Sequence, residues 1–239
     1  MRIVAATFNP IDLKLTSGHM RQIRPLHFPF VPGADFSGVV DLVGNGVNDH
    51  KPGDEAFGYS PAGGAYAEYI AIDADKIARK PRKLSYIDAA SLALVASFAR
   101  LKEYGANRVI DYKTERFEDY AKNVHAVLDV VGGEVQQRSF SVLKPGGVLI
   151  AISQPPSEEE AKKHQVKALM FSTEGTSENL RKIAQLADAG EIKPFIGKTY
   201  PRRDAAQAWH DARTGKFEGK LAFQVAADAN QKSQKASAS

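Results

Sequence analysis

Beginning near residue 108, short runs of β-branched residues alternate with segments long enough to form a helix. The runs are RVIDY at 108–112, HAVLDVV at 125–131 and GGVLIAI at 146–152. The segments between them, EDYAKN and GEVQQRSFSVLK, have lengths that suit helices. Strands joined by helices run parallel in one sheet, because each helix returns the chain to the same end of the sheet. The sequence therefore predicts an α/β fold with a parallel sheet in this region.

The first 84 residues have a different pattern, in which short β-rich runs are separated by Gly and Pro. Examples are VPGADFSGVVDLVG, DEAFGYS and GAYAEYIAI. Regular turns between short strands predict a compact β domain, and Gly33 and Gly38 would let a strand pass close to a neighbouring backbone. From Ser85 the apolar residues recur with the period of a helix, which predicts one helix over 86–104 that ends at Gly105.

The C-terminal part reads as two helices, each followed by a short segment. The helices are expected at 178–189, closed by Gly190, and at 205–212, with FIGKTYP between them and GKLAFQV after them. We therefore divide the chain into a β domain, a partial nucleotide-binding domain, a segment that returns to the β domain and a disordered tail without large apolar side chains. The boundaries are 1–84, 85–197, 198–225 and 226–239.

Composition excludes several classes of protein. The chain has 239 residues and no cysteine, which excludes disulfides, thiolate nucleophiles and thiolate metal sites. Its net charge of +4 is spread along the chain, so nucleic acid is an unlikely partner. The N-terminus lacks the apolar core of a signal peptide, and the longest apolar run, 92–96, is too short to span a membrane. We expect a soluble, cytoplasmic protein that does not bind membranes.

Four consecutive motifs carry a resemblance to a known family. NPIDLK, VPGADFSGVV, PGDEAFGY and GAYAEY have the order and spacing of the GroES-like domain of medium-chain dehydrogenases/reductases. YGANRVIDY, LDVVGG, LKPGGVLIAI and GKLAF continue the pattern, so the resemblance covers residues 2–225. It implies a GroES-like β domain followed by a Rossmann-type parallel-sheet domain.

The resemblance is to the zinc-free branch of that family. The zinc-bound branch carries a His and a Glu within the segment that reads PGADFSG here, and Ala34 stands where that His would be. With no cysteine and six dispersed histidines, the family's catalytic zinc site cannot be assembled. The branch implies reduction of quinones or activated enones by hydride transfer from NADPH, without a metal.

Two departures from the family are expected to matter. The family usually has another strand or two before RIVAATFNP, so the chain resembles a member truncated at its N-terminus. The family also inserts a glycine-rich βαβ unit, at least ~30 residues long, where Ala96 runs directly into Ser97 here. That unit supplies the backbone N–H groups that bind the cofactor's pyrophosphate. We therefore expect an incomplete Rossmann domain and weakened NADPH binding.

The remaining cofactor contacts follow from the resemblance and from strand ends. Tyr112 matches a family position beside the adenosine phosphate, and an ordinary strand-end tyrosine is the alternative. Val131, Gly132 and Gly133 follow one strand, where a cofactor-facing turn and a plain structural turn stay equally open. Two further candidates, Ile152 and Ser153, end the next strand.

The catalytic candidates are Asn9 and Lys14. Pro10 holds Asn9 in an extended conformation, which fixes where its amide points. The resemblance places this amide and the Lys14 ammonium near the nicotinamide and the substrate oxygen, where a donor would stabilise developing negative charge. The alternatives are a turn-forming Asn and a solvated surface Lys. Asp35 is expected to be a structural carboxylate.

Three hypotheses for function stay open at this point. The first is an NADPH-dependent quinone or enone oxidoreductase. The second is a catalytically impaired remnant of such an enzyme, and the third is a single-stranded nucleic-acid binder. Because removal of the central strands would expose an edge of the sheet, a homo-oligomer is also possible.

Overall fold

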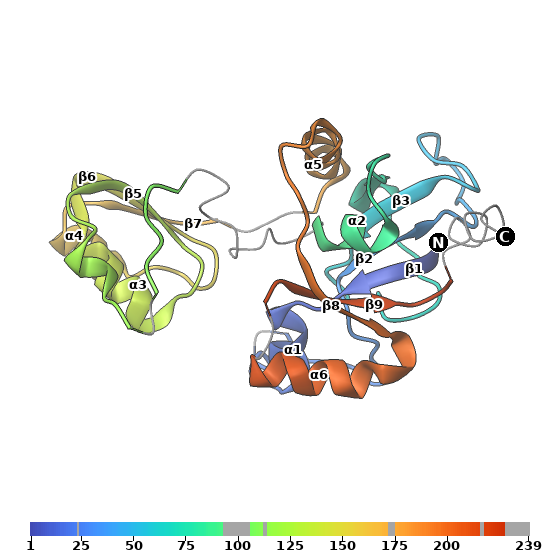
Figure 1. Cartoon of the computed structure of the whole chain (residues 1–239), viewed down its shortest axis with the longest axis horizontal. Helices are drawn as coiled ribbons and strands as arrows, with labels where there is room; N and C mark the ends of the chain where they lie inside the picture. The colour runs from blue at the N-terminus through green and yellow to red at the C-terminus, as the bar shows by residue number, and fades with distance from the viewer. Residues whose placement is uncertain (23, 93–105, 112–113, 172–174, 216–217, 228–239) are drawn as a thin grey trace, which may run out of the picture. The chain divides into compact units, whose positions relative to one another are not determined.

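The computed structural model describes residues 1–22, 24–92, 106–111, 114–171, 175–215 and 218–227. The chain divides into two compact units (Figure 1). The first unit comprises Met1–Ala99 and Gly175–Ser239, and the second comprises Arg100–Glu174. The first and last parts of the chain thus form one compact unit, and the parallel-sheet region forms the other.

The first unit is built on a six-stranded sheet. Its strand order is β4-β3-β2-β1-β9-β8. The N-terminal strand β1 lies between β2 and β9 and is antiparallel to both, and β8 is parallel to β9. The strands are β1 (Arg2–Thr7), β2 (Asp35–Val39), β3 (Glu55–Tyr59), β4 (Ile77–Arg79), β8 (Ile196–Pro201) and β9 (Lys220–Gln224).

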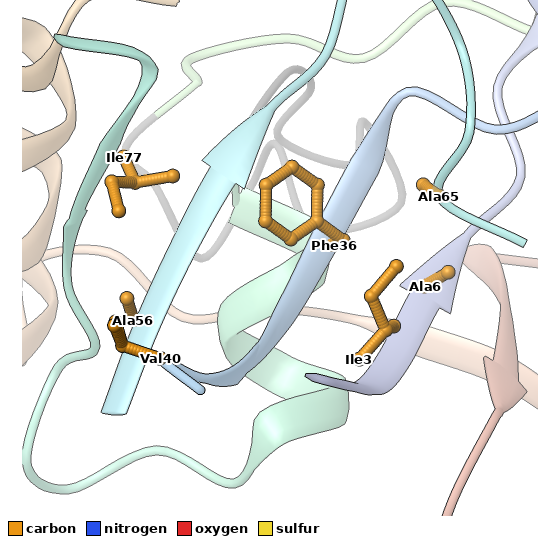
Figure 2. Close-up of a cluster of buried hydrophobic side chains, with 7 residues drawn as sticks. All are labelled: Ile3, Ala6, Phe36, Val40, Ala56, Ala65 and Ile77. Atoms are coloured by element: carbon orange, nitrogen blue, oxygen red, sulfur yellow. The ribbon is translucent and has the colours of Figure 1, made fainter. Parts of the chain in front are cut away.

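Successive side chains of these strands point to opposite faces of the sheet, and those on one face form a core of the first unit. Phe36 on β2 and Ala56 on β3 are fully buried, and they belong to a cluster that joins four strands (Figure 2). Gly38 permits the close approach of β1, because a Cβ at this position would lie 2.1 Å from the carbonyl oxygen of Arg2. The cluster consists of Ile3, Ala6, Phe36, Val40, Ala56, Ala65 and Ile77.

Helices cover the sheet of the first unit. Helix α2 packs on β1 and β2, and α5 packs on β4. Ser85 caps α2 by accepting a hydrogen bond from the Asp88 N–H, and Gly190 ends α5 in the left-handed conformation. The helical elements are α1 (Pro10–Thr16), η1 (Ala74–Lys76), α2 (Tyr86–Leu92), α5 (Ser177–Ala189), η4 (Arg202–Asp204) and α6 (Ala205–Thr214).

The second unit contains a parallel sheet in the order β5-β6-β7. Phe140 from α3 and Ala161 from α4 pack against Leu149 and Ala151 of β6, so both helices cover the same face. The elements are η3 (Phe117–Asp119), β5 (Val124–Asp129), α3 (Gly133–Phe140), β6 (Leu143–Ala151), α4 (Glu158–Lys163) and β7 (Lys167–Met170).

The α/β fold predicted from the sequence is confirmed, with a β-rich unit and a parallel-sheet unit. The strand predicted for RVIDY is wrong for residues 108–111, which lie outside any strand. In the described residues β5 is an edge strand, so this segment has no neighbouring strand with which to form a ladder. The helix expected in EDYAKN is also wrong, since only η3 forms there. Elements α1, β4, α4 and β7 were not predicted, and the expected β-rich run GAYAEYIAI forms no strand, only an isolated bridge at Tyr69.

The two compact units differ in extent from the predicted domains. Helices α2 and α5, which lie within the predicted domain 85–197, pack with the β-rich unit. The functional division at 84/85 and 197/198 stays a prediction. The predicted helix over 86–104 is described only as α2, and the rest of it, like residues 228–239 of the predicted tail, lies outside the described residues.

Substitution of Gly38 tests the close contact between β1 and β2. We expect Gly38→Ala to lower the free energy of unfolding by about 1–3 kcal/mol, because the new methyl group would overlap the Arg2 carbonyl and force the strands apart. Gly44→Ala is the matched control, since a Cβ at Gly44 would meet no atom within 4 Å. Urea unfolding of both variants measures the difference, and equal stabilities would contradict the packing described.

Candidate functional site

The sequence from Asn9 to Asp12 places an amide side chain at the start of α1. Asn9 is extended, with φ −126° and ψ 151°, and Pro10 occupies the first helical position, where a missing N–H costs nothing. The Asn9 N–H donates to Asp12 Oδ2 at 2.8 Å, which closes the turn. The prediction that Pro10 holds Asn9 extended is therefore confirmed, within a helix that was not anticipated.

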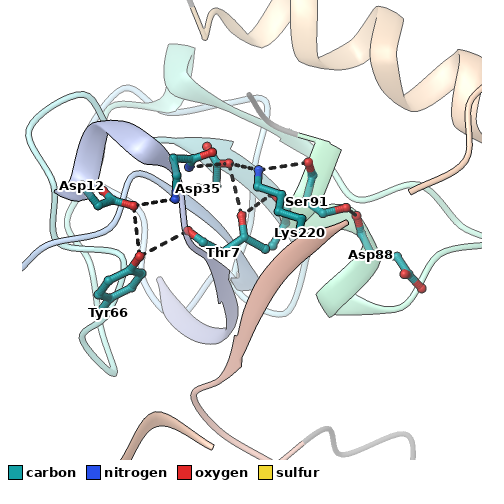
Figure 3. Close-up of polar contacts among 9 residues, drawn as sticks. Thr7, Asp12, Asp35, Tyr66, Asp88, Ser91 and Lys220 are labelled. Carbon is teal, nitrogen blue, oxygen red and sulfur yellow. Dashed lines mark hydrogen bonds and ion pairs between the residues drawn. The ribbon is translucent and has the colours of Figure 1, made fainter. Parts of the chain in front are cut away.

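Asp35 is the centre of a buried polar network (Figure 3). Its side chain is fully buried at the start of β2, and Oδ2 accepts hydrogen bonds from Asn9 Nδ2 at 2.9 Å and Thr7 Oγ1 at 3.2 Å. Lys220, the first residue of β9, places Nζ 2.5 Å from the same oxygen. Lys220 Nζ also donates to the Ser91 carbonyl at 3.2 Å, so the pair joins β2, β9 and α2.

This network fixes the orientation of the Asn9 amide. A carboxylate accepts hydrogen bonds but cannot donate them, so Nδ2 must face Asp35 and Oδ1 must point away. Asn9 Oδ1 and Asp35 Oδ1 are both buried, and neither atom has a hydrogen-bond partner. Asn9 is only 1% exposed, whereas Lys14 lies exposed in the last turn of α1. The two catalytic candidates thus share one short helix but occupy different environments.

A second carboxyl lies beside the network. Burial raises the pKa of Asp12 to about 6, although hydrogen bonds from the Asn9 N–H and the Tyr66 hydroxyl oppose the shift. Tyr66 donates to Asp12 Oδ2 at 3.0 Å, and its own pKa is held well above the usual value by burial and by the Asp12 charge. Ionised Asp12 is therefore costly to bury, and its protonation state changes in the mildly acidic range.

In the second unit, the segment between β5 and α3 forms an ordered turn. Asp129, the last residue of β5, accepts hydrogen bonds at Oδ1 from the N–H groups of Val131 at 3.0 Å and Gly132 at 2.9 Å. Gln136 Nε2 donates to Asp129 Oδ2 at 2.7 Å and to the Gln154 carbonyl at 3.2 Å. These bonds tie the ends of β5 and β6 together through α3.

The turn brings together the predicted cofactor residues of this unit. Gly132 has φ +83°, and a Cβ at this position would lie 2.8 Å from Ser153 Oγ, so only glycine fits. Ser153 Oγ is buried and lacks a hydrogen-bond partner. Val131, two residues after β5, is 63% exposed, and Ile152, directly after β6, is 41% exposed. Gly133 begins α3.

The turn has the features of a polar ligand site. It lies at the carboxyl ends of parallel strands, and it opens a helix whose first N–H groups have no partner within the helix. The unpartnered Ser153 hydroxyl adds one side-chain group that a ligand could satisfy. These residues fit one part of a bound dinucleotide. Tyr112, the candidate for the adenosine phosphate, lies outside the described residues.

Sequence reasoning missed the residues that orient the candidates. Lys220 lies in the GKLAF motif, but its sequence separation from Asp35 gives no indication that they pair. Asp129 carried a usable signal, because an Asp directly before a glycine turn often accepts hydrogen bonds from the backbone two or three residues on. The sequence around Gln136 gave no such signal, because an amide side chain within a short helix is ordinarily exposed.

The described residues contain neither a cluster that could hold a metal ion nor a helix that could span a membrane. In the part of the chain that the structure describes, no three His, Asp or Glu side chains gather closely enough to hold a metal ion. Ala34, where the zinc-bound branch has its His ligand, is buried beside Asp35 in the chain. Among the described helices, none is long and apolar enough to cross a bilayer.

Two family models match the chain. The Alcohol dehydrogenase GroES-like domain matches residues 1–82, and the model described as Zinc-binding dehydrogenase matches residues 104–222. The second description names zinc, whereas Ala34 stands where the resemblance places the family's His ligand and the sequence has no cysteine. Residues 83–103, which include the junction between Ala96 and Ser97, fall between the two matches.

Curated relatives and solved structures show the same similarity. The chain is 28% identical to 2-methylene-furan-3-one reductase of Solanum lycopersicum over 287 residues, covering 92% of this chain and 70% of the relative. It is 24% identical to the chloroplastic NADPH-dependent alkenal/one oxidoreductase of Arabidopsis thaliana, covering 92% and 70%. The structure of the quinone oxidoreductase from Coxiella burnetii matches with a TM-score of 0.81 and 26% identity, over 94% of this chain and 89% of that one.

The buried ion pair can be tested by removing its cation. We expect Lys220→Met to lower the free energy of unfolding by about 3–5 kcal/mol, because it leaves the Asp35 carboxylate buried without a counter-charge. Adding Asp35→Asn to this variant should recover part of the loss, since no buried charge then remains. Lys182→Met, which removes an exposed ion pair with Glu178, should change stability little. If Lys220→Met were as mild as Lys182→Met, the buried pair would not stabilise the fold.

The raised pKa of Asp12 predicts a dependence of stability on pH. Between about pH 4 and pH 6 the folded chain retains a proton on Asp12 that the unfolded chain has lost, so this group's contribution to stability falls as the pH rises through that range. The fall should amount to about 2–3 kcal/mol and be absent from Asp12→Asn. Other carboxyls titrate in both proteins, so the difference between their stability curves isolates Asp12. A constant difference from pH 4 to pH 7 would show that its pKa is not raised.

Proposed function

The chain belongs to the medium-chain dehydrogenase/reductase family of NAD(P)H-dependent oxidoreductases, and from this premise we propose that it is a zinc-independent reductase of quinones or activated enones that uses NADPH. The observation that carries the proposal is the glycine turn after β5, with the unpartnered Ser153 hydroxyl beside it. The named activities of similar proteins, which act on a furanone, on alkenals or enones, and on quinones, support the substrate class.

In this proposal the second unit binds the cofactor. Val131, Gly132, Gly133, Ile152 and Ser153 would hold it at the carboxyl ends of β5 and β6, and Tyr112 would contact the adenosine phosphate. The absence of a Cβ at Gly132 leaves room for Ser153 Oγ beside the turn, and this hydroxyl would gain from the cofactor the partner that it lacks. When bound, NADPH supplies the hydride for the reduction.

Asn9 and Lys14 are proposed to act on the substrate side. A reduced enone or quinone develops negative charge on oxygen, and a nearby ammonium or amide donor stabilises that charge. Lys14 is exposed and could supply an ammonium. Asn9 is buried and already donates through Nδ2 to Asp35, so its contribution in this proposal is to fix the start of α1 or, after a shift of its side chain, to donate to the substrate.

We also propose that cofactor affinity is lower than in complete members of the family. The match to the tomato reductase extends over 287 residues, more than the 239 residues of the chain, so the relative has internal residues that this chain lacks. The sequence contains no glycine-rich turn that follows a strand and opens a helix ahead of residue 104, where the family binds pyrophosphate. This observation favours a second candidate function, a catalytically impaired remnant of such a reductase.

The proposal also covers the size of the substrate, the location of the protein and its oligomeric state. The substrate would be a small molecule, the location cytoplasmic and the chain able to form a homo-oligomer. One relative is named as a chloroplast protein, so members of the family work in more than one compartment.

Titration of NADPH fluorescence tests the proposal. We expect this chain to bind NADPH roughly a hundredfold to ten-thousandfold more weakly than a version with a complete βαβ unit inserted after Ala96, because two lost charge-assisted hydrogen bonds cost about 1.5–3 kcal/mol each. Turnover of a quinone should fall as well, since loose anchoring misaligns the hydride donor. Equal micromolar affinity in both proteins would overturn the predicted weakening.

A glycine variant separates binding at the turn from binding elsewhere. Gly132→Ala should reduce the remaining affinity for NADPH, because the methyl group would meet Ser153 Oγ and strain a backbone with φ +83°. Gly146→Ala is the matched control, since Gly146 has φ +78° but a Cβ there would meet no atom within 4 Å. If the two variants bound NADPH equally well, the turn would not be part of the cofactor site.

A further inference from the structure

The two α-helices described in the second unit, α3 and α4, cover the same face of its parallel sheet (Figure 1). Val127, Leu149 and Ala168 are register partners on β5, β6 and β7. They pack in one cluster with Phe140 of α3 and Ala161 of α4. Because successive side chains of a strand point to opposite faces, the residues that flank these three point to the other face of the sheet.

The other face of the sheet is apolar and exposed. Leu128, Ile150 and Leu169 are register partners that form a row across the three strands. Leu128 is 61% exposed and Leu169 is 54% exposed, and Ile150 between them is partly buried. A second row lies two residues nearer the amino ends of the strands. We call the two rows the open face, which consists of Ala126, Leu128, Val148, Ile150, Lys167 and Leu169.

Exposure of this face is unusual for a parallel sheet. Sheets in which all strands run parallel are ordinarily covered on both faces, since their strands are apolar on both sides. Register partners on neighbouring strands lie about 4.8 Å apart, so the open face is one continuous apolar strip and not a set of scattered residues. Contiguous strips of this kind mark interaction surfaces.

The composition of the open face indicates an apolar and uncharged partner surface. Its one charged residue, Lys167, is the first residue of β7 and lies in the outer row. A flat sheet face packs well on another sheet, at a separation of about 10 Å. A second copy of this chain presents the same flat strip. Across a two-fold axis, the row of Leu128, Ile150 and Leu169 would meet its own copy.

The size of the open face determines how stable such a pair can be. Three strands about 4.8 Å apart, over five residues of about 3.3 Å each, give a flat area of about 250 Å². Two copies would therefore bury about 500 Å², which is below the roughly 1,200 Å² of stable complexes and within the range of transient ones. The area fits a reversible dimer and excludes a permanent one that depends on this face alone.

We propose that the open face binds the open face of a second copy of this chain, in a reversible, two-fold symmetric dimer. The apolar rows match each other, and the absence of acidic groups from the face leaves Lys167 at its margin, where water can solvate it. The proposal does not depend on the reductase activity, because no residue of the open face is a candidate for binding cofactor or substrate.

Sedimentation equilibrium over a wide range of protein concentrations tests the proposal. We expect the average mass to rise from monomer towards dimer, with a Kd of tens to hundreds of micromolar, as is typical of small transient interfaces. A chain that stays monomeric at every concentration, or that continues to larger oligomers, would overturn it.

A charge on the open face should prevent association. We expect Leu169→Glu to raise the Kd at least about tenfold, because its carboxylate would lose hydration in the interface without gaining a counter-charge. Leu42→Glu is the matched control, since Leu42 is an 80% exposed leucine of the first unit, and it should leave the Kd unchanged. If the two variants associated equally well, the open face would not be the interface.

A single introduced cysteine provides a second test that keeps the face apolar. The chain has no cysteine of its own, so any thiol-to-thiol cross-link must join two copies. Ile150→Cys lies at the centre of the row, and a cross-linker that spans about 10 Å should yield covalent dimers, because packed sheets are separated by about that distance. Leu42→Cys is the control. Equal yields from the two variants would refute the two-fold arrangement.

Discussion

The buried ion pair between Lys220 and Asp35 joins β9 to β2 in the first unit. The two residues are separated by 185 positions, yet their side chains meet at 2.5 Å between β9 and β2. Both charges are removed from water, so each depends on the other, and the loss of either leaves an uncompensated buried charge. The last strand, β9, is thereby linked to β2, whose Asp35 orients the Asn9 side chain.

The consequences of this pair extend to the candidate residues. Because Asp35 accepts three hydrogen bonds at one oxygen, it determines the orientation of the Asn9 amide and the position of Thr7. Asp12 and Tyr66 add a second carboxyl whose ionisation is opposed by burial. The start of α1 is therefore held by hydrogen bonds between buried polar groups. Lys14, two residues after Asp12, is exposed to solvent.

In the second unit, the buried carboxylate of Asp129 accepts hydrogen bonds from uncharged donors. Asp129 holds the turn after β5 through backbone N–H groups and Gln136, and the turn needs glycine at position 132 because Ser153 leaves no room for a Cβ. A three-stranded parallel sheet with helices on one face is smaller than a complete dinucleotide-binding domain. The residues that we propose for cofactor binding lie after β5 and β6 of this sheet.

The sequence by itself determined the α/β class, the β-rich first part, helices α3, α5 and α6, and the turn at Gly132 and Gly133. These features follow from local periodicity, caps and glycine positions, which act within a few residues. It also indicated the missing βαβ unit, because a motif and its spacing can be checked directly. The strand expected at 108–111 was wrong because a strand requires a neighbour, and local β propensity cannot supply one.

Only the tertiary structure decided which side chains meet. The pairing of Lys220 with Asp35, the burial of Asn9 and the empty hydrogen-bonding position at Ser153 all depend on contacts between segments that are distant in the sequence. Long-range burial sets the charge, orientation and partners of a side chain, and none of these is encoded by its immediate neighbours.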